Sequence, residues 1–185
     1  LNARAGLGDV TFLGVHFDSA GSAFLLGNQT VSLAGIEARA ADTLITAAGR
    51  ASWEADRWSL GLERAEARSS QFHWVADPPV LLSGDSRGVV FDRLHARDGA
   101  ARLAIEGRWA GPGGVYDWTA RGERLELARL GFPTDWGLGG SADIEMRVSG
   151  ASGDPRWTFE GLARAPGAGG HRDDSLALSL AGSAG

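Results

Sequence analysis

The segment Gly84-Asp85-Ser86 is the first place in the sequence where residue types could do chemistry, because it begins like the nucleophile region of a trypsin-like protease. That chemistry needs a serine beside amides that bind an oxyanion, together with a histidine and a buried aspartate. Arg87 follows the serine where the protease motif has glycine, and the sequence on both sides is typical of strands. We therefore predict that Ser86 lies in a hairpin turn and is not a nucleophile.

Histidines could bind a metal, and the chain has four: His16, His73, His95 and His171. They lie in separate segments, and none has a second ligand at position i+2 or i+4, the spacing that zinc sites use. We expect no metal site. His16 and His73 are expected to be partly buried strand residues.

Two further patterns suggest chemistry but fail on context. Gly137 to Ala142, "GLGGSA", matches the glycines of a dinucleotide-binding loop, but no apolar strand precedes it and a strand-like sequence follows. Asp173 and Asp174 could pair as carboxylates, although a solvated turn before the last strand explains them better. Without a convergent acid, base and nucleophile, the sequence predicts a protein that is not an enzyme and has no cofactor.

The seven tryptophans allow two interpretations. Exposed indole rings would suit a carbohydrate-binding surface, on which sugars stack. Alternatively, Trp58, Trp118 and Trp157 are large core residues near the starts of strands, because each follows an apolar segment, a glycine and a polar turn. We favour the core interpretation.

The elements that must position these residues are strands. In "ADIEMRVSG", Ile144, Met146 and Val148 alternate with charged residues, which predicts a half-buried strand. The same two-residue period recurs at other apolar positions: Leu13, Val15 and Phe17; Leu103, Ile105 and Trp109; Leu125 and Leu127; Leu176, Leu178 and Leu180. By parity, adjacent strands can place Leu125 and Leu127 on the same sheet face as the apolar set of the following strand.

Glycine-rich segments predict turns between these strands, at 111–114, 137–140, 149–155 and 165–170. Residues 52–71 are rich in Ala, Glu and Arg and could form a helix, but the alternation around Gly61 favours a strand. A short helix is expected in "LARLGFPTDW", from Leu127 to Trp136, where the alternation stops.

Length and charge narrow the function classes. The 185 residues predict a single all-β segment, residues 1–185, and the start at Leu1 suggests a fragment of a longer repetitive protein. The net charge is −5 and the 18 basic residues, all Arg, are scattered, so no nucleic-acid partner is expected. No apolar run approaches the roughly 18 to 20 residues that span a bilayer, and the chain has no cysteine.

Three motifs carry a resemblance to a known family: "LELARL" at Leu125 to Leu130, "GGSADIEMRVSG" at Gly139 to Gly150, and "DPRWTFEG" at Asp154 to Gly161. With them, the chain from Ala47 to Gly182 resembles the AsmA-like superfamily of bacterial envelope proteins, most closely its TamB (translocation and assembly module) branch. The resemblance implies an all-β fold, a long curled antiparallel sheet (β-taco-like) of successive hairpins with an apolar concave face.

The resemblance also implies a role in lipid transport between membranes or in outer-membrane assembly. The setting would be the periplasm, with an inner-membrane anchor outside this chain. The expected partners are phospholipid acyl chains, together with outer-membrane assembly proteins or a larger membrane complex. The lipid-groove candidates are Leu103, Ile105, Leu125, Leu127, Ile144, Met146, Val148, Leu176 and Leu178.

Two alternatives stay open. The chain could be a β-sandwich domain that recognises carbohydrate or protein, or a structural subunit that docks on a larger membrane complex. A single sheet with one apolar face must either cover that face or use it, and acyl chains suit a wide apolar groove.

Overall fold

The computed structural model describes residues 2–12, 15–111, 113–129, 139–168, 171–172 and 174–183. The chain forms two compact units. Unit 1 comprises residues 1–86 and 92–96, and unit 2 comprises residues 87–91 and 97–185. Strand β8, from Gly88 to Asp98, contributes residues to both units.

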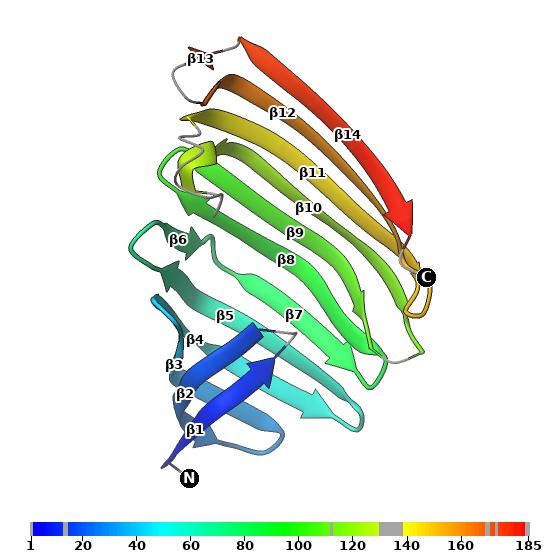
Figure 1. Cartoon of the computed structure of the whole chain (residues 1–185). Helices are drawn as coiled ribbons and strands as arrows, with labels where there is room; N and C mark the ends of the chain where they lie inside the picture. Colours follow the sequence, from blue (N-terminus) through cyan, green and yellow to red (C-terminus); the bar gives the residue numbers. More distant parts are fainter. Residues whose placement is uncertain are drawn as a thin grey trace. The chain divides into compact units, whose positions relative to one another are not determined.

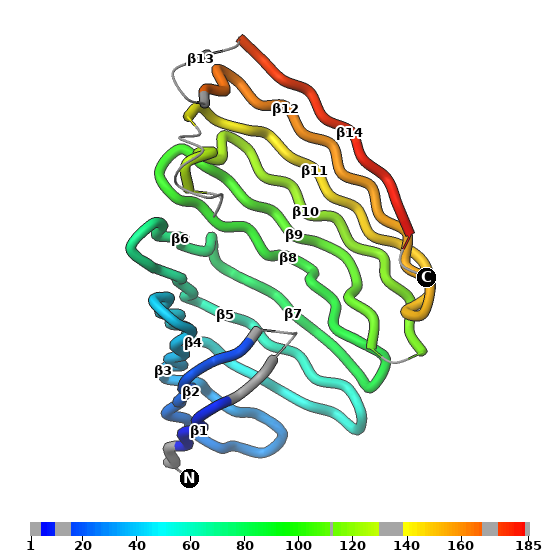
Figure 2. The backbone as a smooth tube through the Cα atoms, in the orientation of Figure 1, coloured from blue at the N-terminus to red at the C-terminus, as the bar shows by residue number. Residues whose placement is uncertain are grey.

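Unit 1 is built from antiparallel hairpins, coloured blue to green in Figures 1 and 2. Its strands are β1 (Asn2–Phe12), β2 (Val15–Leu26), β3 (Thr30–Ala40), β4 (Thr43–Glu54), β5 (Arg57–Arg68), β6 (His73–Ala76) and β7 (Val80–Asp85). Strands β1 to β5 pair in chain order, and β6 and β7 pair with successive parts of β5.

Unit 2 repeats the same plan. Its elements after β8 are β9 (Ala101–Ala110), β10 (Val115–Glu126), the 3-10 turn η1 (Leu127–Arg129), β11 (Gly139–Ala151), β12 (Arg156–Ala168), β13 (His171–Arg172) and β14 (Ser175–Ser183). Strands β9 to β12 pair antiparallel in chain order, and β13 and β14 both pair with β12. The predicted fold class, an all-β antiparallel sheet of successive hairpins, is confirmed.

Short turns explain why consecutive strands pair. Two-residue turns join β3 to β4 at Ala41–Asp42 and β4 to β5 at Ala55–Asp56. The first residue of each has a φ of 52°, in the left-handed region that two-residue hairpin turns require. The strand interpretation of residues 52–71 is therefore confirmed, because this segment forms the end of β4, a turn and β5.

Other local predictions need correction. The glycine-rich segment 111–114 does separate strands. Of the turn predicted at 149–155, only residues 152–155 lie between strands, because β11 runs from Gly139 to Ala151, and β12 continues to Ala168. The turns predicted at 137–140 and 165–170 are thus wrong wherever the structure describes them. The short helix expected from Leu127 is a 3-10 turn that ends at Arg129, and the rest of that prediction lies outside the described residues.

The buried core is thin. The apolar residues that are buried in the described part of the chain are Ala38, Val80, Ala96, Ala101, Ala110, Leu125 and Ala142. Five of these seven are alanines, so little large apolar surface is enclosed. Most of the other apolar side chains in the described residues are half-buried.

Candidate functional site

Strand register in unit 2 brings apolar side chains together on one side of the sheet. Residues directly opposite each other in antiparallel strands share a face. Met146 of β11 lies opposite Ala120 of β10 and Phe159 of β12, and Phe159 lies opposite Leu180 of β14. This row crosses four strands without a polar side chain. We call the side on which these residues lie the apolar face.

Eight of the nine predicted groove residues share this register: Leu103, Ile105, Leu125, Ile144, Met146, Val148, Leu176 and Leu178. The ninth, Leu127, is a correction. It does not continue the strand, because β10 ends at Glu126 and Leu127 is the first residue of η1. The alternation of apolar residues in the sequence therefore continues to Leu127, past the last residue of the strand.

An irregularity in β10 explains how Leu125 reaches the apolar face. Gly122 pairs with Ile144, and the next pair in that ladder is Leu125 with Ala142, so β10 bulges between Gly122 and Leu125. Arg124, inside the bulge, has a φ of 52°, and its backbone N–H donates to Asp143 Oδ1 at 2.8 Å. The extra residue shifts the parity of β10 by one. Odd-numbered Leu125 can then share a face with even-numbered positions.

Sequence reasoning missed several members of the apolar face. Trp118, Trp157, Phe159 and Leu180 share its register, although the tryptophans were interpreted only as core residues and Leu180 only as part of a strand. The alternation in "RWTFEG" could have placed Trp157 and Phe159 on one side of a strand. What the sequence does not show is which strand lies beside them.

Aromatic side chains gather at one end of this face. The rings of Trp109 and Trp118 stack with centroids 5.6 Å apart, and Tyr116 meets Trp109 edge-on, also at 5.6 Å. The stacking places Trp109 on the same face of the sheet as Ile105, as predicted. Trp58, Trp118 and Trp157 all lie near strand starts, as predicted. All three are only half-buried and none belongs to the buried core, so the core interpretation is wrong for them.

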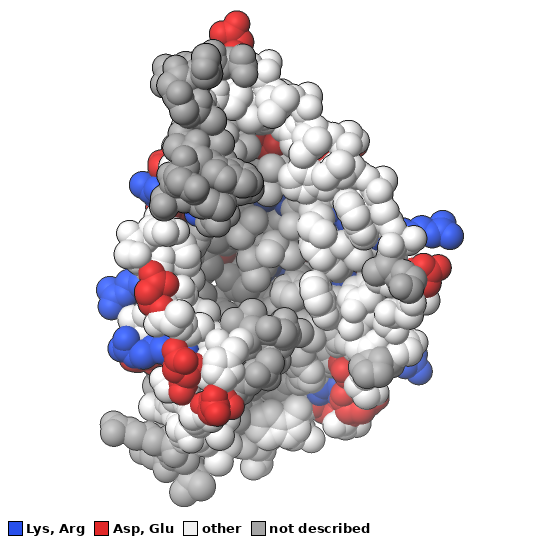
Figure 3. Space-filling model, viewed as in Figure 1, with Lys and Arg blue, Asp and Glu red and all other residues white. Residues whose placement is uncertain are grey.

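Exposure increases across the apolar face toward β14. Leu125 is 4% exposed, whereas Leu176, Leu178 and Leu180 of β14 are 62%, 50% and 48% exposed. In Figure 3 the surface over β11, β12 and β14 is mostly uncharged, with charged side chains at its margin. Contiguous exposed apolar surface is uncommon on soluble proteins and marks sites of interaction.

The opposite side of the unit 2 sheet, which we call the polar face, carries a network of ion pairs. Arg121 contacts Glu145 at 2.9 Å and Glu106 at 3.2 Å, and Arg147 contacts Glu145 at 2.6 Å. The hydrogen bond from Arg121, followed by that from Arg147, lowers the pKa of the Glu145 carboxyl, and Glu145 in turn raises the pKa of Arg121.

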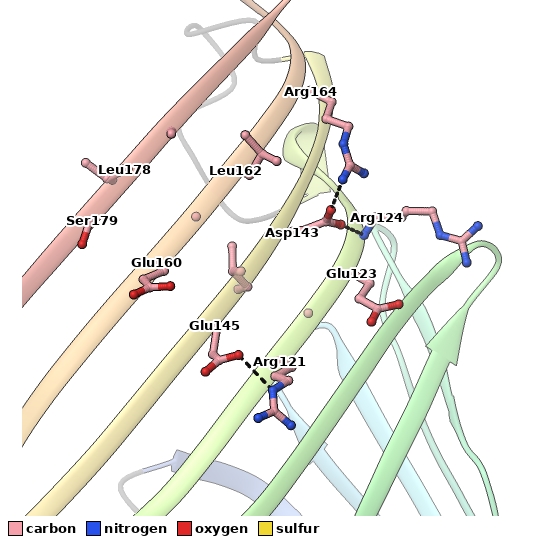
Figure 4. Close-up of a pocket in the computed structure, with 14 residues that line it drawn as sticks. Arg121, Glu123, Arg124, Asp143, Glu145, Glu160, Leu162, Arg164, Leu178 and Ser179 are labelled. Atoms are coloured by element: carbon pink, nitrogen blue, oxygen red, sulfur yellow. Dashed lines mark hydrogen bonds and ion pairs between the residues drawn. The ribbon is translucent and has the colours of Figure 1, made fainter.

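A shallow depression of about 820 Å³ lies on the polar face, beside the β10 bulge. Figure 4 shows Asp143 between Arg124 and Arg164, and its carboxylate contacts Arg164 at 2.7 Å. Glu123 and Glu160 also line the depression, so both signs of charge are mixed within it. A mixed and largely paired set of charges does not select for either an anion or a cation.

The other candidate residues are not members of the apolar face. Ser86 lies in the two-residue turn after β7, so the turn prediction is confirmed. His16 and His73 do lie in strands, but their side chains are 59% and 58% exposed, so the predicted partial burial is wrong. Asp174 forms a bend before β14, and Asp173 lies outside the described residues.

Among the described residues, no three His, Asp or Glu side chains gather where they could hold a metal ion. Nor does that part of the chain contain a helix long and apolar enough to cross a membrane. Comparison with protein-family models, with curated proteins and with solved structures gives no match to the chain.

Proposed function

We propose that the apolar face of unit 2 binds the acyl chains of phospholipids without covalent chemistry. The wider role would be lipid transport between membranes or outer-membrane assembly, in a periplasmic protein of the AsmA-like kind. The observation that carries the proposal is the exposure of Leu176, Leu178 and Leu180 in register with the rest of the face.

The chemistry of the face suits an acyl chain. Each row contains only aliphatic side chains, aromatic rings or glycine, from Trp118 and Val148 at one end to Ala142 and Leu176 at the other. Each methylene group that is fully removed from water contributes about 0.8 kcal/mol to binding. A chain that lies along these rows therefore gains affinity with every carbon in contact, and no polar partner is needed.

The same composition argues against a sugar. Carbohydrate sites combine an exposed aromatic ring with polar groups that bond to hydroxyls. On the apolar face, Trp118 is half-buried, and its Nε1 is enclosed without a hydrogen-bond partner among the described residues. No polar side chain shares the rows that the register defines between β10 and β14.

A charge placed on the exposed part of the apolar face tests the proposal, because the charged side chain would not be buried when the protein folds. Leu178 is half exposed, so Leu178→Asp should fold, but the carboxylate would meet an acyl chain directly. We expect the unmodified chain to retain phosphatidylcholine after incubation with vesicles. Leu178→Asp should bind it at least about tenfold more weakly, a loss of roughly 1.4 kcal/mol.

The matched control is Ala177→Asp, which adds the same charge one residue earlier in β14, on the opposite side of the sheet. It should retain lipid like the unmodified chain. Retained lipid is measured by mass spectrometry of the repurified protein. If the unmodified chain retains no lipid, or if its tryptophan fluorescence is saturably quenched by a soluble oligosaccharide instead, the proposal is wrong.

A further inference from the structure

The two ends of the apolar face differ in chemistry, and we call them the aliphatic end and the aromatic end. The row at the aliphatic end has only side chains that cannot hydrogen-bond: Leu125, Ala142, Ala163 and Leu176. The row at the aromatic end contains Trp118 and Trp157, and Trp109 stacks on Trp118 with Tyr116 edge-on to Trp109. Tryptophan and tyrosine join an apolar ring to a hydrogen-bond donor, so they are common where hydrocarbon meets polar groups.

Trp118 carries a donor that the chain does not satisfy. Its Nε1 is enclosed and has no hydrogen-bond partner among the described residues. The ring of Trp109 lies over the Trp118 ring, with centroids 5.6 Å apart and an angle of 24° between the ring planes. An enclosed N–H without an acceptor is unfavourable, because it has lost its hydrogen bonds to water. A ligand that brings an acceptor to this end would remove that penalty once the Trp109 ring moves aside.

Polar groups lie next to the aromatic end. Figure 1 shows the turn between β9 and β10 and the turn between β11 and β12 at the same end of the sheet. Ser152 links the two turns, because its backbone N–H donates to Gly114 O at 3.0 Å and its Oγ accepts from Gly113 N at 3.2 Å. Asp154 in the second turn is exposed. The polar part of a lipid would therefore reach polar backbone and water beyond this end.

The length of the face suits one acyl chain. Between the row of Trp118 and the row of Leu125, β11 advances from Val148 to Ala142, which is about 20 Å at roughly 3.4 Å per residue. The hydrocarbon core of a bilayer is about 30 Å thick, so the acyl chains of one leaflet occupy about 15 Å. A chain with its terminal methyl group at the aliphatic end therefore carries its ester group near the aromatic end.

We propose that the aromatic end binds the ester region of a phospholipid, with Trp118 Nε1 donating to an ester carbonyl oxygen. The acyl chain runs from there to the aliphatic end. An ester carbonyl accepts hydrogen bonds and donates none, which matches an N–H that lacks an acceptor. The opposite direction would place the ester beside Leu125 and Leu176, where no side chain can donate to it. Trp118 is thus a positioning residue, and the inference rests on the proposed binding of acyl chains by this face.

Two phosphatidylcholines test the role of Trp118, one with ester-linked chains and one with ether-linked chains, which have no carbonyl oxygens. Both are offered in equal amounts in the same vesicles, and retained lipid is measured by mass spectrometry of the repurified protein. The unmodified chain should retain the ester lipid about threefold to tenfold better, the gain expected from one hydrogen bond. Trp118→Phe keeps an aromatic ring without the N–H and should retain the two lipids equally. Because the lipids compete for the same protein, this ratio does not depend on how much of the variant is folded.

The matched control is Trp58→Phe, the same change at a half-buried indole in unit 1, which should keep the preference for the ester lipid. Equal retention of the two lipids by the unmodified chain would overturn the inference and leave acyl-chain binding intact. A preference that survives Trp118→Phe would do the same. Retention of neither lipid would contradict the proposed function, and the inference with it.

The direction of the bound lipid is measured with a fluorescent label on a single introduced cysteine, since the chain has no natural one. Leu180 lies one row from Trp157, and Leu176 lies at the aliphatic end of the same strand. A label on Leu180→Cys should be quenched more by phosphatidylcholine brominated near the ester. A label on Leu176→Cys should be quenched more by phosphatidylcholine brominated near the terminal methyl group. Equal quenching at both positions, or the reverse pattern, would contradict the proposed direction.

Discussion

On one side of the unit 2 sheet, every residue that the register places between β10 and β14 is apolar or glycine, and the side chains nearest the β14 edge are about half exposed. On the other side, Arg121, Glu145 and Arg147 form a connected set of ion pairs. Both faces belong to the same strands and share the same backbone hydrogen bonds. They differ only in which side chains point to each side.

The difference supports placing the proposed binding site on the apolar face. Charged groups on the polar face have partners within the chain or contact water, and the register also places there the exposed large apolar side chain of Leu162, at 38%. Leucines such as Leu176 and Leu178 have no second layer over them in the described residues, and their contact with water is unfavourable. The apolar face, whose leucines the chain leaves exposed to water, is therefore the better candidate for binding.

The largest expected effect is at the buried part of the apolar face. Leu125 is 4% exposed, so Leu125→Ala removes a large side chain from a packed site and should lower the free energy of unfolding by about 2 to 4 kcal/mol. Urea denaturation followed by circular dichroism measures the loss. The same truncation at exposed Thr158, which the register places on the polar face, should change stability by no more than about 0.5 kcal/mol.

Equal losses at Leu125 and Thr158 would break the comparison, because they would mean that the two faces stabilise the sheet equally. If Leu125→Ala lowers the free energy of unfolding and Leu178→Ala does not, the comparison becomes sharper. Half-exposed Leu178 would then contribute to the apolar face without contributing to stability.

The smallest expected effect is the pH dependence of the polar face. The pKa of Glu145 is lowered below its ordinary value of 4.5, so its ion pairs contribute stability above that pH and lose it as the pH falls through the lowered pKa. At neutral pH, Glu145→Gln should melt at a slightly lower temperature than the unmodified chain. The gap should close on acidification. A gap that does not narrow as the pH falls below 4.5 would show that the ion pairs are not its cause.

Much of the apolar face could be predicted from the sequence because strand parity is a local property. Ile144, Met146 and Val148 alternate with charged residues within one segment, and the pleat of a strand converts that alternation directly into faces. The hairpins followed in the same way from the short turns between strands.

The rest depended on pairing between strands. Leu125 lies on the apolar face only because β10 bulges after Gly122, and Leu127 does not because the strand ends first. The alternation of leucines continues through both positions, so the sequence gives no sign of either event. The row that joins Met146, Phe159 and Leu180 likewise depends on register, which no single strand encodes.

The most direct measurement is photocrosslinking at two neighbouring positions of β11 in an otherwise unmodified chain. Position 144 lies on the apolar face, and position 145 carries the Glu145 side chain on the polar face. A photoreactive residue at 144 should form adducts with phospholipid, and one at 145 should form none. Adducts at neither position, in a chain that melts cooperatively and carries no lipid by mass spectrometry, would contradict lipid binding by the apolar face.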